Sequence, residues 1–381
     1  MRINYKDILI VSGLQKNPYH SIRELSKEFK LRKDSVFRTL KKFRSGFLFK
    51  SDYMVNYCKV GLKPLFMFLK TSYQKINKAL SIVKNPYLLE ASLSAAGTGI
   101  FILAKYVYPA DFNMNPILGM ARSWNWITES YMLPIIYEGY NYSFHYFNVS
   151  NQSWDVNWLY WGLMIKEVLI NKRVSEVLPP TNIIEYGETP SHGEAIKCIE
   201  LLIEIIREPE LPVSKFADKL KIDATEIYRA KKLLIETGVL KKYFKINPLL
   251  IDLKEDVAIV IQTSDETVIS GLLNGLILLP VCRYYRVRGQ LEGLIVFVSL
   301  PYGGLSKILH IFSEYLFDKV EDFWLLPTIK VLRFDKLPSI NLLDKSLKWI
   351  NLTLVKNKKA VLYEDYSKIF DLPDRDMEVF G

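Results

Sequence analysis

The stretch SIRELSKEFKLRKDSVFRTLKKFRSGFL (Ser21–Leu48) decides the fold, because PVSKFADKLKIDATEIYRAKKLLIETGVL (Pro212–Leu240) repeats its pattern. With one offset of 191 residues, the apolar positions of the two stretches coincide. Three exposed positions coincide as well: Phe37 with Tyr228, Arg38 with Arg229, and Lys41 with Lys232. Any two helical pairs share apolar spacing, but they have no reason to share exposed cations, so the match indicates a duplication.

The repeat runs through the whole chain of 381 residues. Four more pairs of segments match at offsets between 191 and 194: Thr98–Pro109 with Glu292–Gly303, Tyr131–Ile136 with Trp324–Ile329, Asn157–Ile170 with Lys348–Val361, and Leu178–Pro180 with Leu372–Asp374. Each copy is therefore about 190 residues long, an ordinary size for a structural unit. The joint between the copies falls in the polar, proline-containing stretch Leu178–Gly193.

Each copy begins with the pattern of three short helices followed by strands. In the first copy, helices are predicted over Asn4–Gln15, from Ser21 onward, and from about Lys33 to Arg44. Ser21 and Glu24 have the spacing of a capping box, and Gly46 is typical of the residue that follows a helix. Phe47–Tyr57 alternates loosely and is predicted to form the two strands of a wing. This segment resembles the winged helix-turn-helix family.

The winged helix-turn-helix resemblance implies that the third helix enters the major groove of DNA. The residues placed to meet base edges are Lys33, Asp34, Ser35, Phe37 and Arg38, with Arg32 just before them, and those placed to touch phosphate are Lys41, Lys42, Arg44 and Lys50. Arg38 is the strongest candidate for base reading, because a guanidinium can bridge guanine O6 and N7. The alternative for each of these residues is an exposed charge that only aids solubility.

The second copy keeps this scaffold and alters its exposed face. The positions that remain suited to DNA are Thr225, Tyr228, Arg229 and Lys232. Asp223 and Glu226 would repel phosphate unless they accept a hydrogen bond from a cytosine amine. The second helix-turn-helix could therefore bind DNA weakly, read a different half-site or contact a protein, and the sequence leaves these alternatives open.

Charge separates the two copies further. Residues 1–63 carry fifteen Lys and Arg against five Asp and Glu, an excess equal to the formal net charge of +10 of the whole chain. The matching stretch Glu194–Pro248 carries eleven bases and nine acids. A basic excess confined to one small module favours a surface that binds a polyanion over a merely solvated face.

A second unit follows each set of helices, and its elements are predicted in the ferredoxin-like order β-α-β-β-α-β. The first copy places them at Leu62–Thr71, Tyr73–Val83, two strands around Gly97–Gly99, Asn115–Trp124 and Trp126–Tyr137. The second copy places them at Val257–Thr263, Glu266–Leu278, Cys282–Gln290, Leu294–Leu300, Leu305–Phe317 and Asp322–Leu332. The predicted fold class is α+β, a tandem duplication of a winged helix-turn-helix domain followed by a ferredoxin-like domain, with pseudo-two-fold symmetry. The predicted boundaries are 1–60, 61–178, a linker at 179–193, 194–252 and 253–381.

This combination of domains resembles the Lrp/AsnC family of regulators. The resemblance implies that the second domain self-associates, within the chain or between chains, and that small effectors such as amino acids bind between protomers. The family's G-x-x-D turn corresponds to Gly97, Thr98 and Gly99 in the first copy, and to the turn bounded by Gly289 and Gly293 in the second. The acid is missing from the first copy and displaced in the second, so a tight hairpin is favoured over a ligand site.

Each copy then adds a further strand and helix that the family usually lacks. In the first copy this tract is rich in aromatic residues: Tyr137, Tyr140, Tyr142, Phe144, Tyr146, Phe147, Trp154, Trp158, Tyr160 and Trp161. Clustered aromatic rings can stack on bases, but basic residues are sparse between Tyr131 and Leu163. A core or an interface is therefore the favoured interpretation.

Composition limits the remaining classes of site. Hydrophobic residues make up 49% of the chain, so each copy can bury a core. Cys58, Cys198 and Cys282 show no paired spacing, which predicts a reducing, cytoplasmic location without a disulfide framework. The four histidines are scattered without metal-ligand spacing, so neither a metal nor another cofactor is expected. No signal-peptide pattern opens the chain, and its longest uncharged apolar run, Ala91–Ala104, is too short to span a bilayer.

These observations predict a sequence-specific, non-catalytic transcription regulator that binds double-stranded DNA. No association with a membrane is expected. An enzymatic alternative is open, because siroheme decarboxylases resemble Lrp-type regulators in fold and require His and Arg residues around a tetrapyrrole. The candidates for that chemistry are His145, His310, Arg283, Arg286 and Arg288, with His310 expected in the core. A third interpretation is a protein-interaction scaffold of the transcription or replication machinery.

Overall fold

The computed structural model describes residues 2–97, 99–109, 115–171, 182–187, 198–316, 319–334, 336–338, 340–343 and 348–349. The first copy contains α1 (Tyr5–Lys16), α2 (Ile22–Glu28), α3 (Lys33–Ser45), β1 (Phe49–Val55), β2 (Leu62–Thr71), α4 (Ile76–Val83), β3 (Leu88–Ala96), β4 (Gly99–Pro109), α5 (Asn115–Ser123), β5 (Glu129–Tyr142), β6 (Phe147–Asn148), β7 (Ser153–Trp154) and α6 (Trp158–Asn171). After β8 (Ile183–Glu185), the second copy contains α7 (Ile199–Arg207), α8 (Val213–Leu220), α9 (Ala224–Glu236), β9 (Leu240–Ile246), β10 (Glu255–Gln262), α10 (Glu266–Leu276), β11 (Val281–Val287), β12 (Gly293–Leu300), α11 (Gly304–Tyr315) and β13 (Asp322–Arg333). The predicted α+β class and the order of elements in both ferredoxin-like units are confirmed.

The local signals of the first helix-turn-helix act largely as predicted. The Ser21 side chain accepts from the Glu24 backbone N–H, and the Glu24 carboxylate accepts from the Ser21 N–H, which completes the capping box of α2. The end of α3 differs, because Gly46 keeps a φ of −86° while Phe47 adopts the left-handed φ of 54°. The reversal after α3 therefore occurs one residue later than expected.

The predicted two-stranded wing is wrong. Its residues form the single strand β1, which pairs antiparallel with β9, the matching strand of the second copy. In this ribbon Asp52 lies opposite Tyr243, its own counterpart at the offset of 191. The pseudo-two-fold axis therefore passes through this residue pair. Each strand supplies hydrogen-bond partners for the backbone groups that the other would leave unpaired at its edge.

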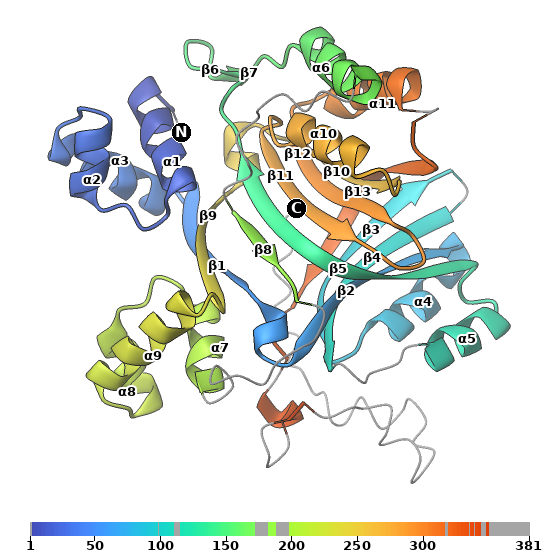
Figure 1. Ribbon diagram of the computed structural model, residues 1–381, viewed down its shortest axis with the longest axis horizontal. Helices are drawn as coiled ribbons and strands as arrows, with labels where there is room; N and C mark the ends of the chain where they lie inside the picture. Colours follow the sequence, from blue (N-terminus) through green and yellow to red (C-terminus); the bar gives the residue numbers. More distant parts are fainter. Residues whose placement is uncertain are drawn as a thin grey trace.

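Two equivalent contacts fix the winged-helix modules to this ribbon. The Tyr19 hydroxyl accepts from the backbone N–H of Lys242 at 3.3 Å. At the matching positions, the Glu210 carboxylate accepts from the backbone N–H of Ser51 at 3.2 Å. Each module is thus held by the strand of the other copy, and Figure 1 shows α1–α3 and α7–α9 along the β1–β9 ribbon, on the same side of the molecule.

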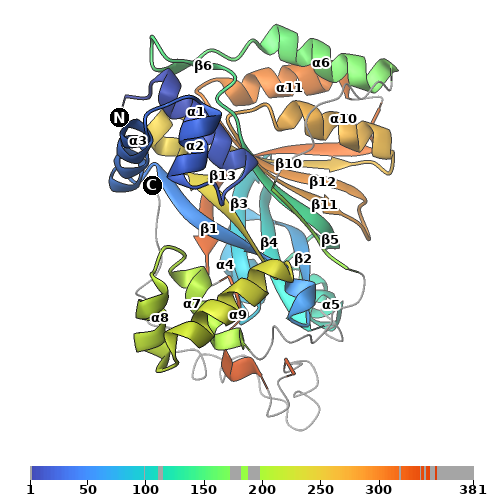
Figure 2. The same ribbon diagram turned by 60° about the vertical axis from the view of Figure 1, so that its left-hand side comes forward.

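The ferredoxin-like strands of both copies join into one closed ring. The order is β11-β12-β10-β13-β3-β4-β2-β5, and β5 pairs back onto β11. The two joints between copies, β13 with β3 and β5 with β11, use equivalent strands, so the ring obeys the same pseudo-two-fold symmetry. Figure 2 shows α10 and α11 on one side of the ring and α4 and α5 on another.

Alternating side chains of the ring strands enter two different cores. Along β10, Ala258 and Val260 face the interior of the ring, whereas Ile259 and Ile261 face the layer of α10, α11 and α6. Inside the ring, Phe66 of the first copy meets the Tyr285 ring of the second edge-on, with centroids 4.8 Å apart. Aromatic packing across the axis therefore joins the two halves.

The aromatic tract serves packing, as favoured, and much of this packing is against the second copy. Tyr140, Tyr142 and Trp161 are buried, and the Trp161 indole donates to the Gly275 carbonyl at 2.9 Å. The predicted linker also contains β8, which pairs with β5. Most of the corresponding tract of the second copy, residues 335–381, lies outside the described residues.

No helix in the part of the chain that the structure describes has both the length and the apolar character needed to cross a membrane.

Candidate nucleic-acid interface

The third helix of the first copy presents nearly all of its predicted DNA-facing residues on its surface. The exposed members of this set are Arg32, Lys33, Asp34, Phe37, Arg38, Lys41, Arg44 and Lys50, while Ser35 and Lys42 are half-buried. The opposite side of α3 buries Val36, Thr39 and Phe43 against the module. Phe37 is 54% exposed, which leaves an aromatic ring among the cations.

The cations of this face differ in their partners. Among the described residues, Lys33, Arg38 and Lys41 form no ion pair. Lys42 is engaged, because its ammonium donates to the buried Asp7 carboxylate at 2.6 Å and to the Arg2 carbonyl. Asp7 is held further by the Thr39 hydroxyl at 2.9 Å. Lys42 therefore fixes α3 to α1, and the free charge of the face comes from its neighbours.

The equivalent face of α9 is exposed but more nearly neutral. Thr225, Tyr228, Arg229 and Lys232 all lie on the surface, with Tyr228 59% exposed. Lys232 lies 3.6 Å from the Glu236 carboxylate. Asp223, the counterpart of Arg32, caps α9 by accepting from the Thr225 N–H at 2.7 Å, and this bond lowers the pKa of its carboxyl. Asp223 thus has a local structural role, whereas α3 begins at Arg32 without a side-chain cap.

The predicted effector turns differ between the copies. In the second copy, the buried Arg286 guanidinium donates to the Val287 and Gly293 carbonyls and to the carboxylates of Glu266 and Glu292. A Cβ on Gly293 would lie 1.8 Å from the Ile261 carbonyl oxygen, so close strand approach requires glycine there. Gly289 has a φ of 129° and lies against Pro134. In the first copy, Gly97 follows the end of β3 and Gly99 begins β4, and Thr98 lies outside the described residues.

A group of charged residues on the pseudo-two-fold axis was not predicted as a site. We call Asp52, Glu90, Lys245, Arg283, Arg333 and Lys336 the axis cluster. Arg283 and Glu90 form a two-pronged ion pair with N–O distances of 2.9 and 2.8 Å, and Arg333 lies 3.6 Å from the same carboxylate. Lys336 donates to Asp52, which also accepts from the Tyr243 hydroxyl at 3.1 Å. Charged residues inside the apolar strands LLEASLS and VCRYYRV were the sequence signal for Glu90 and Arg283.

The axis cluster has more cations than carboxylates. Burial alone would raise the pKa of Glu90, but Arg283 and then Arg333 hold it below its usual range. Burial, with Arg333 and Arg283 nearby, lowers the pKa of Lys245 to about 7. Four basic side chains accompany two carboxylates, so cationic groups outnumber anionic ones in the cluster, and Arg333 and Lys336 are partly exposed to solvent.

The residues suggested for tetrapyrrole chemistry do not gather in one place. The expectation that His310 is in the core is wrong, because its side chain is 75% exposed and lies 3.8 Å from Glu314. His145 is exposed as well. Of the three arginines on β11, Arg283 belongs to the axis cluster, Arg286 fills the hairpin turn and Arg288 is exposed. Among the described residues, no three His, Cys, Asp or Glu side chains are placed to hold a metal ion.

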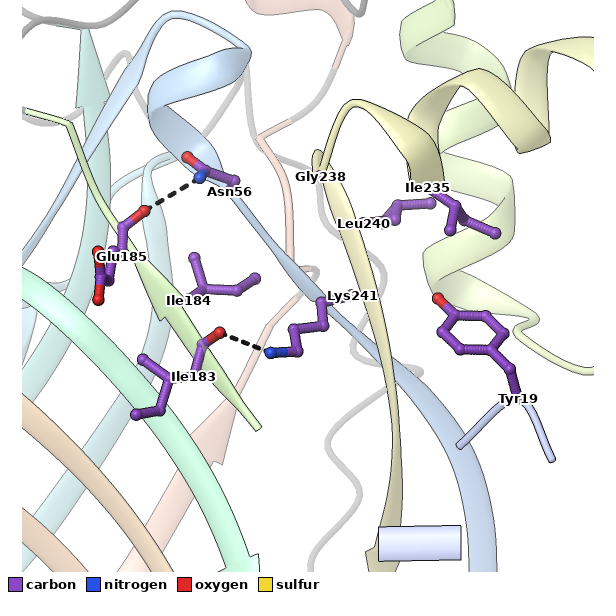
Figure 3. Close-up of a pocket in the computed structure, with 9 residues that line it drawn as sticks. All are labelled: Tyr19, Asn56, Ile183, Ile184, Glu185, Ile235, Gly238, Leu240 and Lys241. Carbon is purple, nitrogen blue, oxygen red and sulfur yellow. Dashed lines mark hydrogen bonds between the residues drawn. The ribbon is translucent and has the colours of Figure 1, made fainter. Parts of the chain in front are cut away.

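One pocket lies between the linker strand and the second winged-helix module. Its volume is about 330 Å³, and Figure 3 shows it between β8 and β9. Asn56 donates to the Glu185 carbonyl at 3.1 Å, and Lys241 donates to the Ile183 carbonyl at 3.0 Å. Both bonds tie β8 to the β1–β9 ribbon.

Solved structures of two kinds resemble this fold, whereas no protein-family model and no curated protein matches the sequence. The siroheme decarboxylase NirDL is similar at 11% identity over 88% of this chain and 94% of that chain, with a TM-score of 0.46. Its complex with an iron-uroporphyrin III analogue covers 92% of this chain and 98% of that chain at 10% identity, with a TM-score of 0.47. B. subtilis LrpC is similar at 19% identity over 35% of this chain and 95% of that chain, with a TM-score of 0.27. E. coli AsnC covers 35% of this chain and 93% of that chain at 15% identity, with a TM-score of 0.27.

These likenesses change one expectation. The Lrp/AsnC regulators match about one third of the chain, whereas the matches over most of its length are an enzyme. The prediction that the chain is not an enzyme is therefore contradicted.

Proposed function

We propose that the chain binds double-stranded DNA through the exposed face of α3 and acts as a sequence-specific transcription regulator. The observation that supports this most directly is the set of three exposed cations, Lys33, Arg38 and Lys41, without ion-pair partners among the described residues. Cations aligned on one helix and free of carboxylate neighbours leave their charge available to phosphate.

Individual roles follow from position on α3. Arg38 lies mid-helix on the exposed face, where a guanidinium can reach a guanine edge in the major groove. Phe37 beside it offers an apolar surface for a thymine methyl group. The other exposed cations of this module, Lys33, Lys41, Arg44 and Lys50, would position it on the phosphates, with Arg44 lying 3.8 Å from the Glu210 carboxylate.

The proposed binder is asymmetric. The ribbon holds two winged-helix modules in one chain, an arrangement that other DNA-binding proteins obtain by dimerising. The α9 face adds Thr225, Tyr228 and Arg229, but Lys232 is paired with Glu236. We therefore propose a strong contact through α3 and a weaker or different one through α9. Effector binding at the two glycine turns stays a prediction.

The dependence of DNA affinity on salt tests this function. We expect the logarithm of the association constant to fall linearly with the logarithm of salt concentration, with a slope of about −4, as for four neutralised phosphates. Fluorescence anisotropy of a labelled duplex, between about 50 and 200 mM salt, measures the slope. Affinity that does not change with salt, or no binding at low salt, would exclude the proposal and leave a protein scaffold as the use of these modules.

A second candidate function is an enzyme that acts on an anionic tetrapyrrole, and the positive surplus of the axis cluster is the observation that favours it. Carboxylates on the rim of such a substrate would balance the charges of Lys245, Arg333 and Lys336. Titration with iron uroporphyrin III should then give a saturable shift of its main absorption band, weakened in Lys336→Gln. An unshifted spectrum would remove this candidate and would not affect the DNA proposal.

A further inference from the structure

The pocket between β8 and β9 combines apolar walls with the ammonium of Lys241. Glu185 also contributes to the lining, but Figure 3 shows its side chain on the side of β8 away from Lys241, and the two form no ion pair among the described residues. Ile184 and Leu240 contribute to its lining, and Figure 3 shows the Lys241 side chain between the two strands. Lys241 is half-buried, and burial lowers the pKa of its ammonium. Among the described residues, the Lys241 ammonium donates one hydrogen bond, to the Ile183 carbonyl, and forms no ion pair. A partly desolvated ammonium without a carboxylate partner attracts an anion.

The repeat shows that this lysine has a changed environment. Lys241 is the counterpart of Lys50 at the offset of 191. Lys50 lies exposed at the edge of the α3 module, whereas Lys241 points to the linker strand that only the junction between copies supplies. The second copy therefore has a cation that faces a pocket in place of solvent.

We propose that this pocket binds a small apolar monocarboxylate. The carboxylate would pair with Lys241 Nζ, and the apolar body would lie against Ile184, Leu240 and Ile235. The volume of about 330 Å³ lies at the lower end of the range of small-molecule pockets, which suits one or two rings and excludes a tetrapyrrole. Tyr19 of the first module forms part of the wall, so the site uses both copies and the linker.

The proposal is independent of DNA binding, because it concerns a different surface. It is tested on the full chain with two probes of the same shape, indole-3-acetate and its neutral analogue indole-3-acetamide, by isothermal titration calorimetry without DNA. Wild-type protein should bind one equivalent of the acid about tenfold more tightly than the amide, since a charge-assisted bond is involved. Lys241→Gln should remove this preference, and the charge-matched control Lys307→Gln on α11 should keep it.

A variant that fills the pocket distinguishes loss of the binding site from misfolding of the protein. Ile235→Trp adds volume at the pocket wall and should abolish binding of both probes while the urea unfolding midpoint stays close to that of the wild type. Equal affinity of wild-type protein for acid and amide would overturn the proposal, as would a preference retained by Lys241→Gln. Absence of saturable binding of either probe to the wild type would overturn it as well.

Discussion

Replacing both Arg38 and Lys41 with alanine is expected to weaken specific binding of duplex DNA about a hundredfold. A bidentate arginine–guanine contact contributes about 1–3 kcal/mol of discrimination, and loss of a phosphate contact adds to it. Both side chains are exposed and have no ion-pair partner among the described residues, so their removal should leave the unfolding midpoint unchanged. An electrophoretic shift series with a duplex selected from a random library measures the loss.

The matched control is the same change in the second copy, Arg229→Ala with Lys232→Ala. We expect a loss below about tenfold, because Lys232 already lies 3.6 Å from Glu236 and Arg229 lies near Asp223. Equal losses in the two double variants would contradict the asymmetry and indicate that both modules hold DNA alike.

The order of elements could be predicted from the sequence because it rests on local signals. The capping box at Ser21, the helical spacing of Val36 and Phe43, and the strand Leu62–Thr71 all depend on near neighbours along the chain. The duplication added a second, independent observation of each element. The exposed face of α3 followed from the same helical period.

The pairing of strands could not be predicted in this way, since it depends on contacts between residues far apart in sequence. A hairpin wing and a strand that pairs with its duplicate have the same local pattern, and only the full fold places β1 against β9. Closure of the ring through β5 and β11 is a similar case. The axis cluster was missed for the same reason, because Glu90 and Arg283 are 193 residues apart.

The substitution Arg283→Glu is expected to lower the free energy of unfolding by about 4 kcal/mol, as when one partner of a buried ion pair is removed. Glu90 and Arg283 occupy equivalent positions in the two copies, and their side chains are only 16% and 24% exposed. The variant would place two carboxylates face to face at the axis, as would occur if both copies had glutamate at this position. Urea denaturation followed by circular dichroism measures the loss, and the electrostatic origin predicts that it shrinks as the pH is lowered and the carboxyls take up protons.

The double variant Glu90→Arg with Arg283→Glu separates charge from packing. It should recover about half of the lost free energy of unfolding. The swapped ion pair re-forms, but the new arginine at position 90 lies beside Arg333, whose guanidinium is 3.6 Å from the Glu90 carboxylate in the wild type. Arg283→Met, which adds no charge, should fall between the wild type and Arg283→Glu. A swap no more stable than Arg283→Glu alone would show that shape, and not charge, joins the halves. A symmetric dimer of either half would bring Glu90 against Glu90 or Arg283 against Arg283. Recovery of stability by the swap would therefore show that the two copies have diverged at the axis, so that each copy pairs with the other within one chain.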